Sequence, residues 1–388
     1  MKELPSSGSF SVRWHHRVLT CRNAFTDSGE ALAQLFESTP DPARVLCVLD
    51  DGLVQANQPL PARITRWAHA HPEHIDLAGS PLIVPGGEQA KNDRTVFDQV
   101  VRAIHERRIC RQSFVLAVGG GAMLDAVGLA AATSHRGVRL VRLPSTTLGQ
   151  ADAGVGVKNG INAFGAKNLI GTFAPPWAVV NDATLLPTLS DRDWRAGLSE
   201  AIKVALLKDE LLLLDIEHAA VALRTRDLDV MERITTQTAD LHVAHIVHGG
   251  DPFETNRARP LDFGHWSAHQ LEQMTGFRLS HGDAVAIGLM IDLQYAAIAL
   301  GGSQSLVSRV ASCLQSLGFP LCCDAMSDHD RLLDGLERFR EHLGGTMAIT
   351  MVTEPEQAHE VSVIDRDLMR QAIELTVRRG GEHMSRTG

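Results

Sequence analysis

The first half of the chain alternates between short apolar runs and longer amphipathic segments. Apolar runs typical of buried strands occur in RVLCVLD, SFVLAVG, VRLVRLP and WAVVND, and segments with helical periodicity lie near 60–72 and 97–108. A parallel strand covered on both faces reads as a continuous apolar run, and such strands alternate with helices in βαβ units. This half is therefore predicted to be a doubly wound, Rossmann-like α/β domain with its ligand at the carboxyl ends of the strands.

From about Leu186 the pattern changes to long segments with the period of an α-helix. Examples are DWRAGLSEAIKVALL, DVMERITTQTADLHVAHIV and AVAIGLMIDLQYAAIAL. We therefore predict two domains, an α/β domain over 1–185 and a mostly α-helical domain over 186–388, with their boundary near 183–188.

Composition and charge narrow the range of partners. The chain of 388 residues is 44% hydrophobic and has a formal net charge of −9, which argues against nucleic acid or an anionic membrane surface as a partner. No uninterrupted apolar run approaches the roughly 20 residues of a membrane span. The six cysteines form no CxxC pair, and Cys47 and Cys110 border apolar segments where buried thiols are expected. This pattern favours a reducing cytoplasm.

The segment 261–288, LDFGHWSAHQLEQMTGFRLSHGDAVAIG, carries a candidate metal site. His265 and His269 are four residues apart, so both project from one face of a helix, and His281 stands just before an apolar helix. Three convergent imidazoles, or two with a carboxylate, suit a catalytic zinc ion with an open position. In a chain with 18 histidines such a pair is also common on an ordinary helix surface, so the spacing leaves both interpretations open.

Two glycine-rich segments are candidates for binding an anion. Gly119, Gly120 and Gly121 separate a strand from a helix, where the backbone can approach a pyrophosphate and the helix N-terminus supplies donors. The GxGxxG fingerprint is absent, and a tight structural turn explains these glycines equally well. STTLGQADAGVGVKNGINAFGAKN, which we expect to be a long connection, brings two lysines together with small polar residues, as an oxygen-rich anion requires.

Six segments occur together in this chain: PGGEQAK, GGGAMLDAVG, STTLGQADAGVGVKNGINAFGAKN, RAGLSEAIK, DFGHWSAH and SHGDAVAIG. In order and spacing they resemble the 3-dehydroquinate synthase-like superfamily, the sugar phosphate cyclases, over nearly the whole chain. The resemblance implies a dehydroquinate synthase-like fold, NAD and a divalent metal as cofactors, a small sugar phosphate as substrate, and a homodimer.

The resemblance also assigns individual residues. The metal, zinc with cobalt as an alternative, would be held by Glu200, His265 and His281, so that His269 becomes a substrate contact instead of a ligand. The residues implied for catalysis are Asp152, Lys158, Lys203, Glu254 and His269. Those implied for substrate binding are Arg136, which would reach the neighbouring subunit's site, with Lys167, Asn168 and Asp262. Those implied around the nicotinamide cofactor are Asp50, Glu88, Lys91, Gly119, Gly120, Gly121, Asp125, Thr146 and Thr147.

Departures from the family pattern bear on the substrate. Dehydroquinate synthases proper carry an arginine seven residues before the first metal histidine and an asparagine three before it, where this sequence has Ala258, flanked by Arg257 and Arg259, and Asp262. A lysine expected near 244 is absent, and another, a few residues before Gly345, is replaced by the stretch 340–342. Fewer cations and one more carboxylate disfavour a substrate that carries both a carboxylate and a phosphate.

These departures favour a cyclase for a heptulose phosphate without a carboxylate, such as sedoheptulose 7-phosphate, which would yield a C7 cyclitol ketone. ARPLDFGHWSAH and KNGINAFGAKN resemble the EboD-type and C7-cyclitol synthase branches most closely. The alternatives are a dehydroquinate synthase acting on 3-deoxy-arabino-heptulosonate 7-phosphate and a glycerol dehydrogenase-like alcohol dehydrogenase. A non-catalytic relative would have broken metal ligands, whereas Glu200, His265 and His281 are all present.

Overall fold

The computed structural model describes residues 8, 11–36, 42–254 and 259–387. Its first half contains a seven-stranded sheet in which all of the paired strands are parallel. The strand order is β1 (Val18–Cys21), β9 (Ala178–Asp182), β6 (Arg139–Pro144), β5 (Phe114–Gly119), β2 (Ala43–Asp50) and β3 (Ile75–Leu77), and β4 (Leu82–Val84) also pairs with β2.

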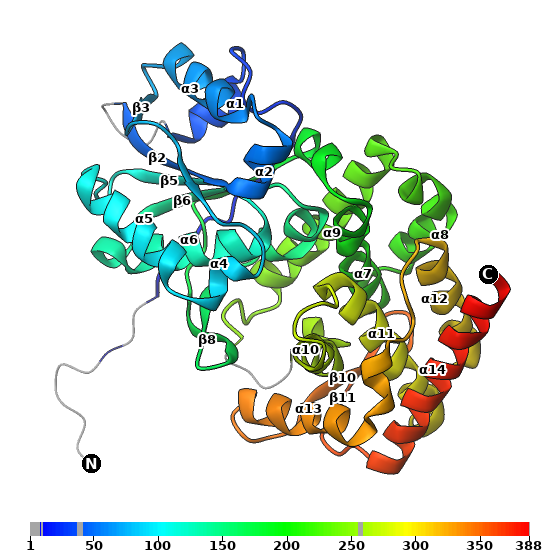
Figure 1. The fold of residues 1–388 in the computed structure, drawn as a ribbon. Helices are drawn as coiled ribbons and strands as arrows, with labels where there is room; N and C mark the ends of the chain where they lie inside the picture. The colour runs from blue at the N-terminus through cyan, green and yellow to red at the C-terminus, as the bar shows by residue number, and fades with distance from the viewer. Residues whose placement is uncertain (1–7, 9–10, 37–41, 255–258, 388) are drawn as a thin grey trace, which may run out of the picture.

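Helices cover both faces of this sheet (Figure 1). One core contains α1 (Glu30–Ala33), α2 (Asp51–Ala56) and α3 (Leu60–Ala70), and the other contains α4 (Gln89–Asn92), α5 (Thr95–Glu106) and α6 (Gly121–Thr133). Successive residues of β5 alternate between the two cores, with Leu116 in the first and Val115 and Ala117 in the second. The doubly wound sheet predicted from the sequence is confirmed.

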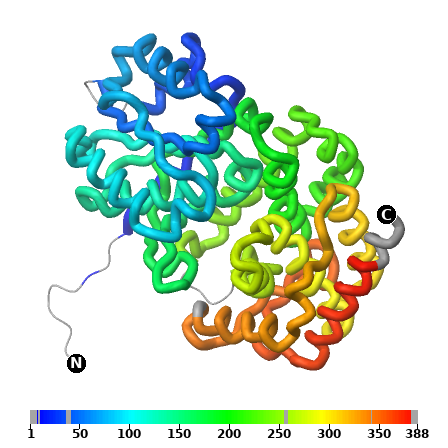
Figure 2. Tube along the Cα trace, viewed as in Figure 1, coloured from blue at the N-terminus to red at the C-terminus, as the bar shows by residue number. Residues whose placement is uncertain are grey.

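The second half is mostly helical, as predicted, and occupies its own side of the molecule (Figure 2). After the 3-10 segment Ala183–Thr188, the helices are α7 (Asp191–Lys208), α8 (Glu210–Arg224), α9 (Leu228–His248), α10 (His265–Met274), α11 (His281–Ala299), α12 (Gln304–Ser316), α13 (His329–His342) and α14 (Arg366–Thr387). A short antiparallel hairpin, β10 (Ile349–Glu354) and β11 (Gln357–Val361), was not predicted.

Helix α11 is the central helix of this half. By length and composition alone it could cross a membrane, with a mean hydropathy of 1.3, but 83% of that window is buried inside the fold. Helices α7, α10, α12 and α14 all pack against it. Its apolar character is therefore explained by burial in a protein core.

The thiols are free, and their burial follows the strand pattern only in part. Cys47 in β2 is buried, as predicted, whereas Cys110 is exposed, so the prediction for Cys110 was wrong. Cys110 lies in the connection between α5 and β5. The preceding residue, Ile109, is the one that enters the core there, with a side chain that is 1% exposed.

The long connection predicted after β6 is a folded element. A π-helical turn, Gly149–Ala153, leads into an antiparallel hairpin formed by β7 (Lys158–Ala163) and β8 (Ala166–Phe173). The two residues between the strands, Phe164 and Gly165, both have positive φ angles, of 51° and 76°, as in the two-residue turns that match the twist of a hairpin. The prediction of a loop was wrong because the asparagines and glycines of these strands are poor strand formers.

Arg142 in β6 anchors the base of this hairpin. Its guanidinium is fully buried and donates to the carbonyl oxygens of Gly154 (3.2 Å), Gly156 (2.9 Å) and Lys158 (3.0 Å) and to Oδ1 of Asn159 (2.5 Å). One side chain from the sheet thus satisfies three carbonyl groups of the segment that leads into β7, and this fixes where β7 begins.

We expect Arg142→Met to destabilise the protein by about 2–4 kcal/mol, because several buried acceptors would each lose a partner. Urea unfolding followed by circular dichroism measures this loss. Arg94→Met, which removes an exposed arginine that pairs with Asp98 and lies over the ring of Phe97, is the control and should change stability by less than about 0.5 kcal/mol. Equal stability of the two variants would contradict the anchoring role of Arg142.

Candidate active site

A cavity of about 300 Å³ lies between the two halves of the chain. Its wall combines the segments that follow β4, β5 and β6 with residues of α7, α9, α10 and α11. Many of the residues predicted for the site meet here. They are Glu88, Lys91, Gly121, Asp125, Asp152, Lys158, Lys167, Asn168, Lys203, Glu254, Asp262, His265, His269 and His281.

Three side chains form a group that could hold a metal ion: Glu200, His265 and His281. The two histidines line the cavity, and Glu200 is not among the described residues that line it. Glu200 comes from the middle of α7, while His265 and His281 are the first residues of α10 and α11. Oε1 of Glu200 lies 3.4 Å from Nε2 of each histidine. Two ligands bound to one tetrahedral zinc ion at about 2.0–2.1 Å lie roughly 3.3–3.4 Å apart, so the observed spacing fits.

The state of Glu200 supports the same interpretation. Its side chain is 0% exposed, and neither carboxylate oxygen makes a hydrogen bond of acceptable geometry, although Lys203 Nζ lies 2.5 Å from Oε2. A buried carboxylate normally has its oxygens satisfied. The unsatisfied Oε1, facing two imidazole nitrogens, is the donor arrangement that a divalent ion completes.

Each of these histidines is oriented by a partner at its other nitrogen. Nδ1 of His265 lies 3.1 Å from the carbonyl oxygen of Phe263, and Nδ1 of His281 lies 3.4 Å from Oε2 of Glu272. With the proton on Nδ1, Nε2 of both rings is free to face Glu200. Without a bound ion, burial alone would lower the pKa of His281, but Glu272 and Glu200 outweigh it and raise that pKa to about 10, so ion binding would displace the proton on Nε2.

The turn before His265 is held by a carboxylate from α11. Asp292 accepts hydrogen bonds from the backbone N–H of Gly264 (2.9 Å) and from Nε1 of Trp266 (2.7 Å), on either side of His265. Gly264 has a φ of 79°, which favours glycine at this position. Complete burial raises the pKa of Asp292 to about 7. One helix therefore supplies His281 and also fixes the approach of His265.

His269 lies beside this group without entering it. Its ring is 5.4 Å from that of His265 and 5.9 Å from that of His281, and it lines the cavity. Burial, and then the neighbouring His265, hold the pKa of His269 well below its usual range. The side chain therefore presents a neutral imidazole to the cavity. The donor atoms of Glu200, His265 and His281 form one candidate group, and His269 belongs to a second one with Glu272 and His281.

A second buried charge cluster surrounds Lys203. Burial would lower the pKa of its ammonium, but Glu200 and Asp152 outweigh this effect and raise that pKa. Burial and the nearby Glu200 would raise the pKa of Asp152, but Lys203 and His242 outweigh them and lower that pKa to about 2. The cluster is therefore charged over the whole physiological pH range.

Two histidines of α9 were missed by the sequence analysis. His242 Nδ1 lies 3.0 Å from Oδ1 of Asp152, and His245 lines the cavity one helical turn later. Burial, with Lys208 next in effect, lowers the pKa of His245 to about 4, so this ring is neutral. Their spacing of three residues on one helix face is the signal that could have revealed them. They stand near position 244, where the family pattern led us to expect a lysine.

The outer wall of the cavity is a set of ion pairs. Lys158 Nζ lies 2.5 Å from Oε1 of Glu254, whose Oε2 is 3.9 Å from Nε of Arg259. Lys167 on β8 lies 2.8 Å from Oε1 of Glu272 and 3.7 Å from Glu88. Ala258 and Arg257 lie outside the described residues. Arg340 pairs with Glu337, and the structure does not place it among the described residues that line the cavity.

Burial would raise the pKa of Glu272, but His281 and Lys167 outweigh it and hold that pKa well below its usual range. Sequence analysis missed this buried glutamate too. It follows His265 by seven residues, so both lie on the same face of α10, and this spacing was the available signal.

Only some of the residues predicted to surround the cofactor line the cavity. Helix α6 begins at Gly121 without a side-chain cap, and Gly121 and Ala122 line the cavity, so free backbone donors face it. A Cβ at Gly121 would lie 2.9 Å from that of Ala153. The ion pair between Lys91 and Asp125, at 2.6 Å, borders the same region. An uncapped helix N-terminus behind a glycine turn fits the pyrophosphate of a dinucleotide.

Other residues predicted at this end have structural partners. Asp50 accepts from the N–H groups of Gly52, Leu53 and Gly120. Thr146 accepts from the N–H of Gly149, and the fully buried Thr147 donates to the carbonyl of Asp193 and accepts from Gly197. Gly119 and Gly120 belong to the same turn. The structure does not place these residues, or the exposed Arg136, among the described residues that line the cavity.

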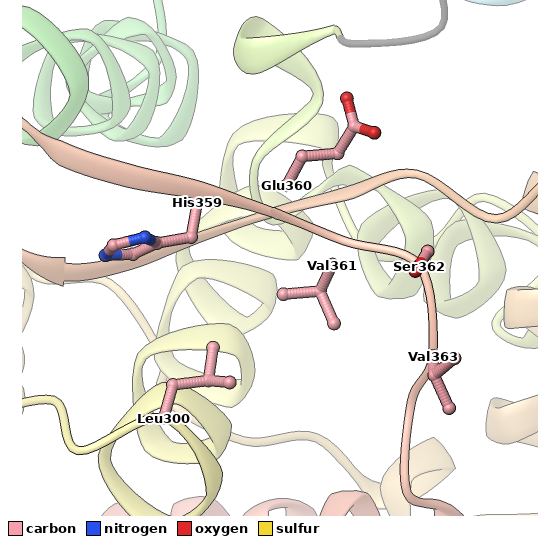
Figure 3. A pocket seen from close by; sticks show the side chains of 6 residues that line it. All are labelled: Leu300, His359, Glu360, Val361, Ser362 and Val363. Carbon is pink, nitrogen blue, oxygen red and sulfur yellow. The ribbon is translucent and has the colours of Figure 1, made fainter.

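A second hollow lies on the β10–β11 hairpin, lined by Leu300 and residues 359–363. Figure 3 shows the carboxylate of Glu360 pointing away from Leu300 and Val361, and the imidazole of His359 pointing to the other side. Polar groups do not converge in this hollow, which makes it a poor candidate for chemistry.

The chain matches known families and proteins along most of its length. Residues 81–196 match the family described as 3-dehydroquinate synthase N-terminal, and residues 197–342 match 3-dehydroquinate synthase C-terminal. The 3-dehydroquinate synthase of Pelobacter propionicus is 37% identical over 66% of this chain and 70% of its own length. That of Paracoccus denitrificans is 35% identical over 75% of this chain and 80% of its own.

Among solved structures, the chain resembles ValA, the 2-epi-5-epi-valiolone synthase from Streptomyces hygroscopicus subsp. jinggangensis 5008, with NAD⁺ and Zn²⁺ bound. The TM-score is 0.86 at 26% identity, over 96% of this chain and 99% of that one.

We expect Zn²⁺ at one hundred times its Kd to stabilise the protein by about 2.7 kcal/mol, since a ligand that binds only the folded state has this effect. Thermal unfolding of chelator-treated protein with and without Zn²⁺ measures it. Glu200→Gln should abolish the stabilisation because the buried anionic donor is lost. Asp152→Asn removes a half-buried carboxylate from the neighbouring cluster and should keep the response to zinc. A Glu200→Gln variant that is still stabilised by zinc would exclude this carboxylate as a ligand.

Proposed function

The chain belongs to the 3-dehydroquinate synthase family, and from this premise we propose that it is a sugar phosphate cyclase for a heptulose phosphate without a carboxylate, such as sedoheptulose 7-phosphate. One observation carries the choice of substrate. Each of the four lysines that line the described cavity already has a carboxylate within 2.8 Å. A substrate carboxylate would meet a wall in which carboxylates outnumber lysines.

Asp262 adds a further carboxylate to the cavity wall. It lines the cavity from the 3-10 turn Pro260–Asp262, and its charge raises the pKa of Lys203, after the larger effects of burial, Glu200 and Asp152. A carboxylate here repels a second carboxylate and accepts hydrogen bonds from hydroxyl groups. A polyhydroxylated, carboxylate-free substrate suits this part of the wall.

The proposal includes NAD and a divalent ion, zinc or cobalt, as cofactors. The relative ValA holds NAD⁺ and Zn²⁺. Glu200, His265 and His281 would hold the ion, and the N-terminus of α6 would receive the pyrophosphate of NAD. A bound divalent ion lowers the pKa of a substrate hydroxyl and polarises a carbonyl, and NAD accepts and returns a hydride.

The remaining residues bind the substrate and manage its charges. Lys203 keeps a positive charge beside the metal group, where it stabilises negative charge that develops on a substrate oxygen. Lys158, Lys167 and Asn168 supply donors for the phosphate, and the two lysines would exchange their present carboxylate partners for it. His269 contributes a neutral imidazole, and Glu200 and then Asp152 hold Lys203 in its charged form.

The net reaction is an elimination followed by ring closure. Transient oxidation of one hydroxyl acidifies the neighbouring C–H bond, and the departing phosphate takes that proton. After the ketone is reduced back, the hemiketal ring of the sugar opens to give an enol and a ketone, and the enol carbon adds to that ketone in an intramolecular aldol reaction that closes the carbocycle. Because the substrate supplies its own base, the protein mainly has to hold it in the reactive geometry.

The proposed assembly is a homodimer in the cytoplasm. Arg136 is exposed on the 3-10 segment Ser134–Arg136 and has a φ of 61°. Arg136 is not among the described residues that line its own subunit's cavity, which suits a role in a neighbouring subunit's site. The six free thiols suit a reducing compartment.

A second candidate is dehydroquinate synthase activity on 3-deoxy-arabino-heptulosonate 7-phosphate. The names of the curated relatives favour it. Arg259, 3.9 Å from Glu254, is an arginine beside the described cavity that could turn toward a substrate carboxylate.

We expect steady-state phosphate release to be faster, in kcat/KM, with sedoheptulose 7-phosphate than with 3-deoxy-arabino-heptulosonate 7-phosphate, because the latter brings a second anion into the cavity. Both substrates are assayed with NAD⁺ and Zn²⁺, and omission of either cofactor is the control. A preference for the carboxylate-bearing substrate would overturn the proposed substrate class and support the second candidate.

We expect Asp262→Asn to shift the ratio of kcat/KM values toward the carboxylate-bearing substrate by about tenfold, which corresponds to about 1.4 kcal/mol of relieved repulsion. Glu254→Gln removes a carboxylate that is already paired with Lys158, so it serves as the matched control and should shift the ratio much less. An unchanged ratio in Asp262→Asn would remove Asp262 from the argument.

A further inference from the structure

Glu272 joins the two halves of the chain at the edge of the metal group. It projects from α10, is 3% exposed, and uses its two oxygens in different directions. Oε1 accepts from Lys167 on β8 at 2.8 Å, and Oε2 lies 3.4 Å from Nδ1 of His281. Figure 1 shows the β7–β8 hairpin beside α10, so this carboxylate spans the contact between them.

Lys167 is held at this position by its surroundings. Most neighbouring residues of β8 are exposed, whereas the Lys167 side chain is 16% exposed. Its ammonium lies 5.1 Å from the centre of the Phe277 ring, just beyond α10, and 3.7 Å from Glu88. The ion pair between Lys167 and Glu272 is therefore short and largely shielded from water, and this shielding strengthens it.

A second metal ion is the competing explanation for this cluster. His269, Glu272 and His281 offer donor atoms within 4.8 Å of one another. However, the ammonium of Lys167 already lies against Oε1 of Glu272, and a second divalent ion would face that positive charge at close range. His281 would also have to bind through both nitrogens. The cluster is better explained as support for one ion than as a site for two.

We propose that Glu272 is a positioning residue that couples Lys167 of the hairpin to the metal ligand His281. Its Oε2 keeps Nε2 of His281 directed at Glu200, and its negative charge, partly neutralised by Lys167, adds to the field at the ion. Binding of the substrate's anionic group at Lys167 and binding of the ion are then energetically linked, because both depend on one carboxylate. This inference rests on the proposed metal-dependent function of the same site.

The coupling predicts opposite effects of two substitutions on metal affinity. Glu272→Gln keeps the shape but loses the charge and the strong acceptor for Nδ1, so we expect the Kd for Zn²⁺ to rise roughly 10- to 100-fold. Lys167→Met removes a positive charge that opposes the ion, so we expect the Kd to fall at least about threefold. The Kd is measured by competition with a chromophoric chelator on the full-length protein, without substrate or turnover.

Glu88→Gln is the matched control, because Glu88 also approaches Lys167, at 3.7 Å, but forms no hydrogen bond or ion pair with His281 in the described part of the chain. Its zinc Kd should stay within about twofold of the wild-type value. If Glu272→Gln does not fold, Lys167→Met still tests the coupling on its own. A Kd that is unchanged in either variant, or that shifts equally in Glu88→Gln, would overturn the proposal.

The chelator assay separates this inference from the proposed function. Wild-type protein that binds zinc, with a Glu272→Gln variant of unchanged Kd, would overturn the positioning role and leave the cyclase proposal intact. Wild-type protein that binds no divalent ion would overturn both.

Discussion

A carboxylate that is completely removed from water has to be stabilised from within the protein, and Glu200 imposes this demand on the site. An unpaired buried ion costs several kcal/mol, so the fold has to bring compensating groups to the middle of α7. It does so with Lys203 one turn along the same helix and with two imidazoles from the first turns of α10 and α11. Three helices therefore contribute the groups around one carboxylate.

The residues around Glu200 are themselves arranged as pairs of opposite charge. Lys203 is shared with Asp152, and Lys167 is shared by Glu272 and Glu88. Because opposite charges are paired, the cavity contains many charged groups but has a modest net charge. The paired groups can also exchange one hydrogen-bonding partner for another. A polar ligand can enter by replacing a carboxylate in these pairs, which costs less than ordering solvated side chains.

The fold was predictable from the sequence, because period-2 and period-3.6 patterns survive wherever an element is buried on a defined face. The β7–β8 hairpin escaped because it is largely exposed and rich in asparagine and glycine, so its sequence carries no burial pattern. Spacing alone suggested His265 with His269, and the family resemblance was needed to point to Glu200. Asp50 and Thr147 show the converse: the structure gives each of them backbone partners that no motif could reveal. Helix spacing could have pointed to Glu272 and His242, but it does not encode their partners Lys167 and Asp152, which lie on other segments.

All three members of the metal group belong to the helical half of the chain, and α11 fixes two of them, through His281 itself and through Asp292 beside His265. The glycine turn and the start of α6 belong to the other half. A rotation of one half against the other would alter the gap between these two groups and leave the distances among Glu200, His265 and His281 unchanged. The geometry of the metal group is therefore independent of how the two halves meet, whereas its separation from the start of α6 is not.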